Sequence, residues 1–274
     1  MELYNSLIRD TLAALGPPAP RAWDYRESDC RRDLGSSELV LQKDAAYELG
    51  SSGHGSLNCV LFTSSPEFCD RDRVELWGPD LGEIRADTDF ARIAILRVGV
   101  LDDDSERVYR ILKDIEFAKY HVNPEGYMVR ISPESCREQV RVSRKALRGG
   151  ISLRAVGCSY IREYRKDPNV LNARVLFLTG PGYDYPGLLE IAKKASAVTG
   201  TLTTILEGLP TDCSVCSLKG ICDEVDGMKE LHFGVGAKGA DRRAPRSRPP
   251  HPRHTGSLPT PGRLLFPLPR QIHD

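Results

Sequence analysis

The sequence has no run of apolar residues that approaches the roughly 18 needed for a membrane-spanning helix. Residues 1–4 also lack the positively charged region and apolar segment that open a secretory signal. We therefore expect no membrane association and a cytoplasmic location. In such a reducing compartment, the eight cysteines are expected to serve metal binding or redox chemistry rather than disulfide formation.

Two common catalytic motifs are also absent. No G-x-S-x-G occurs and the six histidines lie near no motif with a nucleophile, so the sequence gives no support for serine hydrolase chemistry. The glycine-rich stretch 48–56 lacks the G-x-x-x-x-G-K-[ST] pattern and precedes an expected strand, whereas a phosphate loop precedes a helix. We interpret this stretch as a connecting loop.

The chain has no net charge, because 38 Lys and Arg balance 38 Asp and Glu. This balance hides an asymmetry: residues 236–274 hold eight basic and two acidic residues, which leaves 30 basic and 36 acidic residues in 1–235. An acidic folded region is not expected to bind nucleic acid. The last 39 residues contain eight prolines and no apolar periodicity, so we predict a disordered basic tail over 236–274.

Three cysteines gather in one short stretch as C-x2-C-x5-C, at Cys213, Cys216 and Cys222. Cysteines this close cannot all find disulfide partners among themselves, so the spacing predicts a thiolate-bound metal centre. Zinc modules usually bring two C-x2-C pairs and this chain has one, which favours a [4Fe–4S] cluster over zinc. The alternative is a helix start with cysteines placed by chance.

A cluster or zinc site of this kind normally has four protein ligands, and the stretch supplies three. The fourth ligand is open, and we take Cys158 as the leading choice because it directly follows the basic motif near Gly157. The other candidates are Cys136, Cys59, Cys69 and Cys30, His232 for zinc, or an exogenous ligand.

The apolar pattern predicts an α+β fold with a mixed, largely antiparallel sheet flanked by helices. Strands are expected at residues 38–42, 57–63, 74–77, 90–100, 127–131, 139–143 and 172–179. Helices are expected at residues 3–15, 102–120, 144–147, 151–166 and 188–198. We divide the chain into an N-terminal helix with an irregular connection (1–36), an α+β domain (37–208), a cysteine cluster segment (209–235) and the tail (236–274).

Residues 130–166 are dense in Lys and Arg for an acidic region. Within them, Arg144, Lys145 and Arg148 gather beside the glycine turn 149–150, with Arg141 just upstream. This grouping would suit a phosphorylated cofactor or an acidic partner protein such as a ferredoxin. The alternative is a solvated helix face paired with Glu134, Glu138 and Glu163.

The same region carries a family resemblance. Residues 140–146 (V-R-V-S-R-K-A) and the glycines and leucine that follow, at positions 149, 150, 153 and 157, resemble a segment in the β subunit of the carbon monoxide dehydrogenase/acetyl-CoA synthase complex. Residues 48–50 (E-L-G) and 77–84 (W-G-P-D-L-G-E-I) also resemble the middle region of that subunit. The resemblance covers residues 38–232 and implies the fold of that middle region.

In the full enzyme, a cubane cluster bridged to a dinickel site joins a methyl group, CO and coenzyme A into acetyl-CoA. The resemblance places cluster ligands at Cys213, Cys216 and Cys222. The chain has no Cys-Gly-Cys, the tripeptide that supplies two thiolates and two backbone nitrogens to one nickel, so bound nickel is not expected.

Three functions follow as expectations. The first is an iron–sulfur protein of one-carbon metabolism, an electron-transfer, assembly or regulatory partner of carbon monoxide dehydrogenase or of a corrinoid or ferredoxin-type protein. The second is acetyl-CoA synthesis itself, with the phosphates of coenzyme A near Arg144 and Arg148. The third is a zinc-stabilised binding module without redox chemistry.

Overall fold

The computed structural model describes residues 1–16, 19–35, 39–50, 56–99, 105–131 and 138–206. The predicted cysteine cluster segment, 209–235, and the predicted tail, 236–274, lie outside the described residues, as does most of the glycine-rich stretch.

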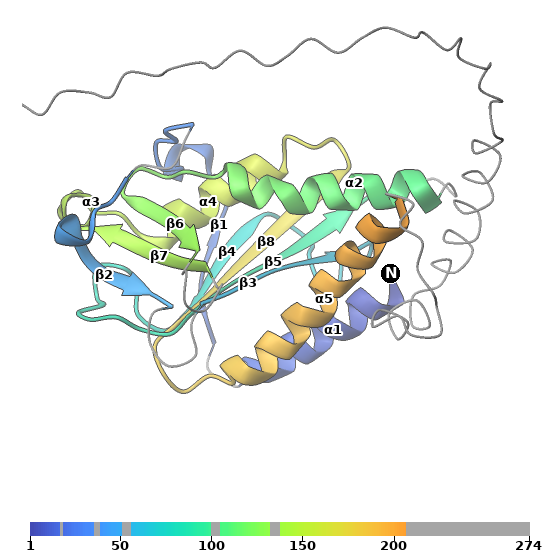
Figure 1. The fold of residues 1–274 in the computed structure, drawn as a ribbon, viewed down its shortest axis with the longest axis horizontal. Coiled ribbons are helices and arrows are strands. Elements are labelled where there is room, and N and C mark those ends of the chain that lie inside the picture. The colour runs from blue at the N-terminus through green and yellow to red at the C-terminus, as the bar shows by residue number, and fades with distance from the viewer. Residues whose placement is uncertain (17–18, 36–38, 51–55, 100–104, 132–137, 207–274) are drawn as a thin grey trace, which may run out of the picture.

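A five-stranded mixed sheet forms the centre of the molecule (Figure 1), in the order β1-β4-β8-β5-β3. Its strands are β1 (Arg21–Asp24), β3 (Ser56–Thr63), β4 (Arg73–Trp77), β5 (Phe90–Val98) and β8 (Val170–Thr179). β1 with β4 and β5 with β8 pair antiparallel, while β4 with β8 and β3 with β5 pair parallel. The expected α+β class and mixed sheet are confirmed, although antiparallel pairing does not dominate this sheet.

A smaller antiparallel sheet lies beside the first, in the order β2-β7-β6. Its strands are β2 (Ala45–Leu49), β6 (Tyr127–Ile131) and β7 (Glu138–Ser143). β7 continues directly into a five-residue helix, α3 (Arg144–Arg148). The smaller sheet therefore carries the basic residues of the sequence motif.

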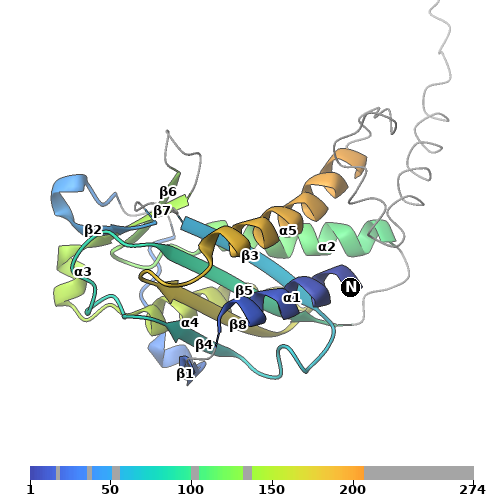
Figure 2. The same cartoon turned by 90° about the horizontal axis from the view of Figure 1, so that it is seen from below.

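Helices cover the larger sheet on both faces (Figures 1 and 2). α1 (Glu2–Ala14) and α5 (Tyr185–Leu206) pack against β3 and each other, and α4 (Leu153–Tyr164) packs against β4 and β8 on the opposite face. The remaining helix, α2 (Ser105–Phe117), leads into a 3-10 turn at Ala118–His121. Among the helices described, none is both long and apolar enough to cross a membrane.

One continuous core joins these layers. Tyr4, Leu7 and Ile8 of α1 belong to the same buried cluster as the strands of the larger sheet. α1 and β1 are thus integral to the fold, although the sequence assigned residues 1–36 to a separate segment. The interior strands β5 and β8 read as apolar runs because both of their faces are covered.

Three local expectations were wrong. Residues 39–41 form no strand: Val40 is buried, but Leu39 is 75 % exposed. The strand in this region is β2, which begins later, at Ala45. Residues 21–24, expected to be irregular, form β1 because β4 offers them a partner. α5 continues through Gly200 to Leu206, since one helical glycine costs only about 1 kcal/mol and Val198 and Thr201 remain buried beside it.

The close packing of α4 gives a stability test. A Cβ at Gly157 would come within 2.6 Å of both methyl groups of Val74 and 3.0 Å of Phe177 Cε2. We expect Gly157→Ala to lower the free energy of unfolding by about 1–3 kcal/mol through overpacking, measured by urea denaturation. The control is Gly200→Ala, where no heavy atom lies within 4 Å of the new Cβ. This control should gain about 0.5–1 kcal/mol, so equal effects at the two sites would contradict the packing.

Candidate anion-binding site

The cations of the basic segment divide into two groups. Most pair with carboxylates, as the alternative interpretation expected, and all of these partners except Glu163 lie far away in the sequence. The pairs are Arg130 and Arg141 with Glu48, Arg154 with Asp29, Arg162 with Glu27 and Asp33, Arg165 with Asp72, and Lys166 with Glu163. Of the partners expected from the sequence, Glu163 is found in this role and Glu138 pairs instead with Arg92; Glu134 is not among the described residues.

Arg141, one of the predicted cofactor-binding residues, is engaged within the smaller sheet. It lies opposite Glu48 in the pairing of β7 with β2, and its Nε donates a hydrogen bond to Glu48 Oε1. Its Nη1 donates to the carbonyl oxygen of Val40 at 3.3 Å, and Arg130 donates to Glu48 Oε2 at 2.9 Å. The guanidinium of Arg141 thus stabilises the pairing of β7 with β2.

These hydrogen bonds stabilise the ionised carboxylate of Glu48. Partial burial would raise the pKa of Glu48, but the hydrogen bonds from Arg141 and Arg130 outweigh it and hold this pKa below the usual glutamate value. The folded protein therefore binds a proton at Glu48 less readily than the unfolded chain does, and the ion pair contributes to stability at neutral pH.

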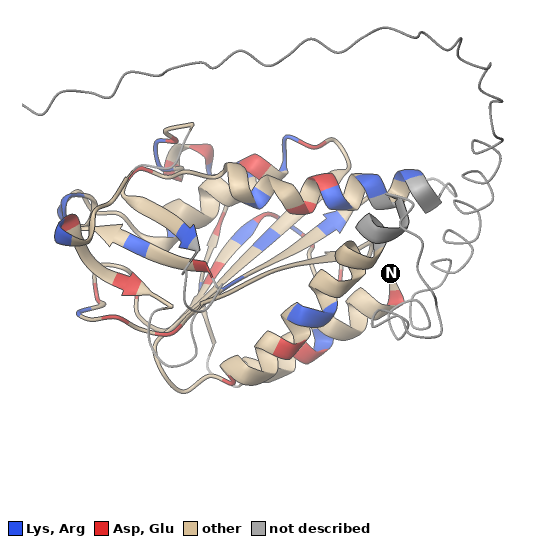
Figure 3. Ribbon diagram, in the orientation of Figure 1, with Lys and Arg blue, Asp and Glu red and all other residues tan. Residues whose placement is uncertain are grey.

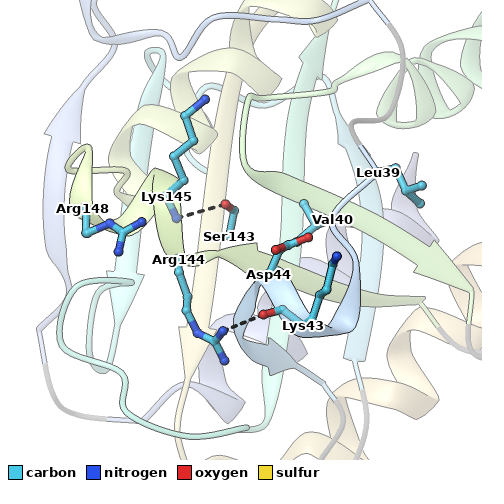
Figure 4. A pocket seen from close by; sticks show the side chains of 8 residues that line it. All are labelled: Leu39, Val40, Lys43, Asp44, Ser143, Arg144, Lys145 and Arg148. Carbon is cyan, nitrogen blue, oxygen red and sulfur yellow. Dashed lines mark hydrogen bonds between the residues drawn. The ribbon is translucent and has the colours of Figure 1, made fainter.

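The other three predicted residues, Arg144, Lys145 and Arg148, come together on α3. They line a pocket of about 430 Å³ with Lys43, Asp44 and Ser143 and with the apolar Leu39 and Val40 (Figure 4). α3 forms one wall of this pocket and the turn before β2 forms the other. The structure therefore brings three of the four predicted cofactor-binding residues to one concave surface.

Local sequence explains the position of α3. The Ser143 hydroxyl caps the helix by accepting hydrogen bonds from the backbone N–H of Lys145 at 3.2 Å and of Ala146 at 3.5 Å. Ala146 packs on Gly126, where a Cβ would lie only 2.1 Å from the Cβ of Ala146. On the pocket side, Arg144 Nη1 donates to the carbonyl oxygen of Lys43 at 2.6 Å (Figure 4), which ties α3 to the opposite wall.

The charge of this pocket is strongly positive. Its lining carries four cations and one carboxylate, Asp44, for a net charge of +3. Within the described part of the chain, no carboxylate lies within 4 Å of the charged groups of Lys43, Arg144 or Arg148, while Lys145 Nζ is 4.0 Å from Glu125. Figure 3 shows these cations at the end of the molecule formed by α3 and the smaller sheet. Such a surface attracts a multiply charged anion.

Lys43 and Asp44 were not found by the sequence argument. They lie about a hundred positions before α3, and only the pairing of β2 with β7 brings them to it. The sequence offers no periodic or motif signal for this contact.

The cysteines predicted to bind metal are placed as follows. Cys213, Cys216 and Cys222 fall outside the described residues, and within the described ranges no group of three or more His, Cys, Asp or Glu side chains could hold a metal ion. Cys158 is fully buried on α4, and burial raises the pKa of its thiol. A raised pKa disfavours the thiolate that binds a metal.

The other described cysteines share this property. Burial raises the pKa of Cys59 to about 12, and that of Cys69 and of Cys30 to about 11. Each is thus held as a neutral thiol, which packs as a small apolar side chain. The other fourth-ligand candidates, Cys136 and His232, lie outside the described residues.

Residues 77–84, which contribute to the family resemblance, have clear structural roles. Asp80 Oδ1 accepts hydrogen bonds from the backbone N–H of Leu81 and of Leu153, both at 2.7 Å, and so holds the first turn of α4. Gly78 has a φ of +98°, and a Cβ there would lie 2.1 Å from the carbonyl oxygen of Thr179. The turn after β4 therefore explains Gly78, and the hydrogen bond to the first turn of α4 explains Asp80.

Comparison with models of known protein families gives no match, and comparison with characterised proteins gives no significant match either. The resemblance to the acetyl-CoA synthase β subunit thus rests on the residues quoted above alone.

The ion pair of Glu48 predicts a pH dependence. Because its pKa is lowered on folding, the stabilisation is complete above the unfolded glutamate pKa of about 4.3 and is lost as the pH falls through the folded value. At pH 7, Glu48→Gln should lower the free energy of unfolding, measured by urea denaturation, by about 2 kcal/mol. The difference from the wild type should shrink as the pH is lowered below the unfolded glutamate pKa of about 4.3 and through the folded value.

The control for this experiment is Glu67→Gln, a change at an exposed residue that forms no ion pair with described residues. It should track the wild type at every pH. A Glu48→Gln protein whose deficit is the same at pH 7 and pH 3 would show that the carboxylate charge does not matter.

Proposed function

We propose that the chain binds a small, multiply charged anion, specifically a phosphorylated cofactor, between α3 and the turn before β2. The observation that supports this is the pocket with a net charge of +3 whose Lys43, Arg144 and Arg148 have no carboxylate partner in the described structure. Guanidinium groups bind phosphate oxygens with pairs of charge-assisted hydrogen bonds. Surface cations ordinarily pair with nearby acids, as most others of the segment do, but among the described residues only Lys145 of the four pocket cations has such a partner.

The size of the pocket agrees with a ligand of this class. Its volume of about 430 Å³ falls in the roughly 300–1,000 Å³ typical of small-molecule sites. Coenzyme A is the candidate that the family resemblance offers, since it carries three phosphate groups. The apolar Leu39 and Val40 at one side of the pocket would contact the less polar part of such a ligand.

We further propose that Cys213, Cys216 and Cys222 hold a [4Fe–4S] cluster. Their spacing supports this. The fourth ligand stays open between Cys158, which the sequence favours, Cys136 and an exogenous ligand. His232 would complete a zinc site in the alternative, a zinc-stabilised binding module.

Together these proposals describe an iron–sulfur protein of one-carbon metabolism that serves carbon monoxide dehydrogenase, or a corrinoid or ferredoxin-type protein, in electron transfer, assembly or regulation. Acetyl-CoA synthesis remains the alternative, although the chain lacks the Cys-Gly-Cys that would bind nickel.

Anion binding is tested by titrating coenzyme A, and separately inorganic pyrophosphate, into the full chain by calorimetry. Arg144→Ala and Arg148→Ala should each weaken binding by about tenfold or more, because each removes a charge-assisted hydrogen bond. The affinity should also fall as salt is added. The matched control is Lys166→Ala, a cation of the same segment that pairs with Glu163. Equal affinity in all three variants and the wild type would refute the site.

The cluster is tested by purifying the protein without oxygen and measuring its visible absorption and its iron, nickel and zinc content. The expected result is a brown protein with about four irons per chain, and a loss of colour in Cys216→Ser but not in Ser214→Ala. Cys158→Ser should keep its colour if the fourth ligand lies elsewhere. A colourless protein with one zinc would select the binding module, and retained nickel would favour the enzyme.

A further inference from the structure

A second pocket, of about 260 Å³, opens at the edge strand β3. Figure 1 shows β3 at the margin of the larger sheet, next to α5. The wall from α5 includes Leu189, Ala192 and Lys193, and the opposite wall includes Lys119 of the 3-10 turn and Glu138 of β7. This pocket shares no lining residue with the basic pocket, and the inference drawn from it is independent of the proposed function.

Two ionised side chains of this pocket are largely buried. The side chain of Lys119 is 8 % exposed and that of Glu138 is 13 % exposed. Burial would lower the pKa of Lys119, but the nearby carboxylates, Glu116 foremost, raise it, so the ammonium group stays charged. Burying such groups is costly unless they are paired, and a protein retains them where they meet a partner or a ligand.

Two hydrogen bonds orient the carboxylate of Glu138. Its Oε2 accepts hydrogen bonds from Asn58 Nδ2 at 2.7 Å and from Arg92 Nη2 at 3.4 Å. Arg92 is itself fixed by Tyr160, whose hydroxyl accepts from Nη1 and whose ring centroid lies 4.1 Å from the guanidinium carbon. Both hydrogen bonds of the Glu138 side chain with described residues go to Oε2, which leaves Oε1 for a ligand.

The charges around this pocket balance one another. Glu138 pairs with Arg92, Lys119 with Glu116 at 3.1 Å, and Lys193 with Glu190 at 2.6 Å. A ligand with a net charge would leave an uncompensated charge in a partly buried site. A ligand that carries one charge of each sign would not, because it can face Glu138 with its cation and the lysines with its anion.

We propose that this pocket binds a small zwitterion of the α-amino acid class. Its ammonium group would donate to Glu138, its carboxylate would face Lys119 and Lys193, and an apolar side chain would lie on Leu189 and Ala192. The pocket volume lies just below the roughly 300 Å³ at which sites for drug-sized ligands begin, which fits a molecule of amino acid size.

Calorimetric titration of the full chain with L-alanine, L-valine and L-leucine tests this proposal. At least one of the three should bind. The charge requirement is tested with N-acetyl-L-leucine, which lacks the ammonium group, and with L-leucinamide, which lacks the carboxylate. Each should bind about tenfold more weakly than L-leucine, or not at all. Absence of binding by all three amino acids would overturn the proposal, and so would binding of either derivative as tight as that of L-leucine.

Variants locate the site. Glu138→Gln should abolish amino acid binding, and its thermal unfolding shows whether the loss comes from misfolding, since Arg92 then lacks its carboxylate. Lys193→Glu avoids this ambiguity because Lys193 is 60 % exposed on α5. It should weaken binding by about tenfold, while Lys194→Glu, the same change at the exposed neighbouring position outside the lining, should not. Equal effects of the two lysine changes would place the ligand elsewhere.

Discussion

The buried guanidinium of Arg92 is the interaction on which the arrangement of layers depends. It is 3 % exposed on an interior strand of the larger sheet, it donates to Tyr160 of α4, and it pairs with Glu138 of the smaller sheet. Loss of one partner from a buried ion pair typically costs about 3–5 kcal/mol. Because Arg92 contacts α4 and the smaller sheet from the larger one, it links all three, and a shift of one layer would separate a buried charge from its partner.

The six-residue strand β7 transmits that constraint to both candidate sites. Its first residue, Glu138, lines the pocket at the edge of β3, and its last residue, Ser143, caps α3 and lines the basic pocket. Between them, Arg141 pairs with Glu48 and locks β7 to β2. The two sites differ in chemistry. In the first, three of the four cations have no carboxylate partner among the described residues, whereas in the second each charged lining residue is paired. Both sites nevertheless take residues from the same strand.

How much the sequence could predict follows the range of the interactions. The apolar runs of β5 and β8 and the cations of α3 are local features, and they were found. The contacts of Arg92 with Glu138, of Asn58 with Glu138 and of Lys43 with Arg144 join residues 46 to 101 positions apart. The first two contacts arise because the two sheets pack together, and the third arises because β2 pairs with β7. Arg141 shows the limit well, since its motif marks it as a ligand-binding residue and its register makes it a partner of Glu48.

The cysteines show why spacing carries more information than number. Eight cysteines in a chain without expected disulfides were taken together as a sign of metal or redox chemistry. Four of them pack against the apolar core, Cys59, Cys69 and Cys158 as buried side chains and Cys30 as a half-buried one, and burial raises the pKa of all four thiols. The prediction of a metal centre therefore depends on the C-x2-C-x5-C spacing alone. Three thiols within ten residues gain nothing from being close together unless they bind the same ligand.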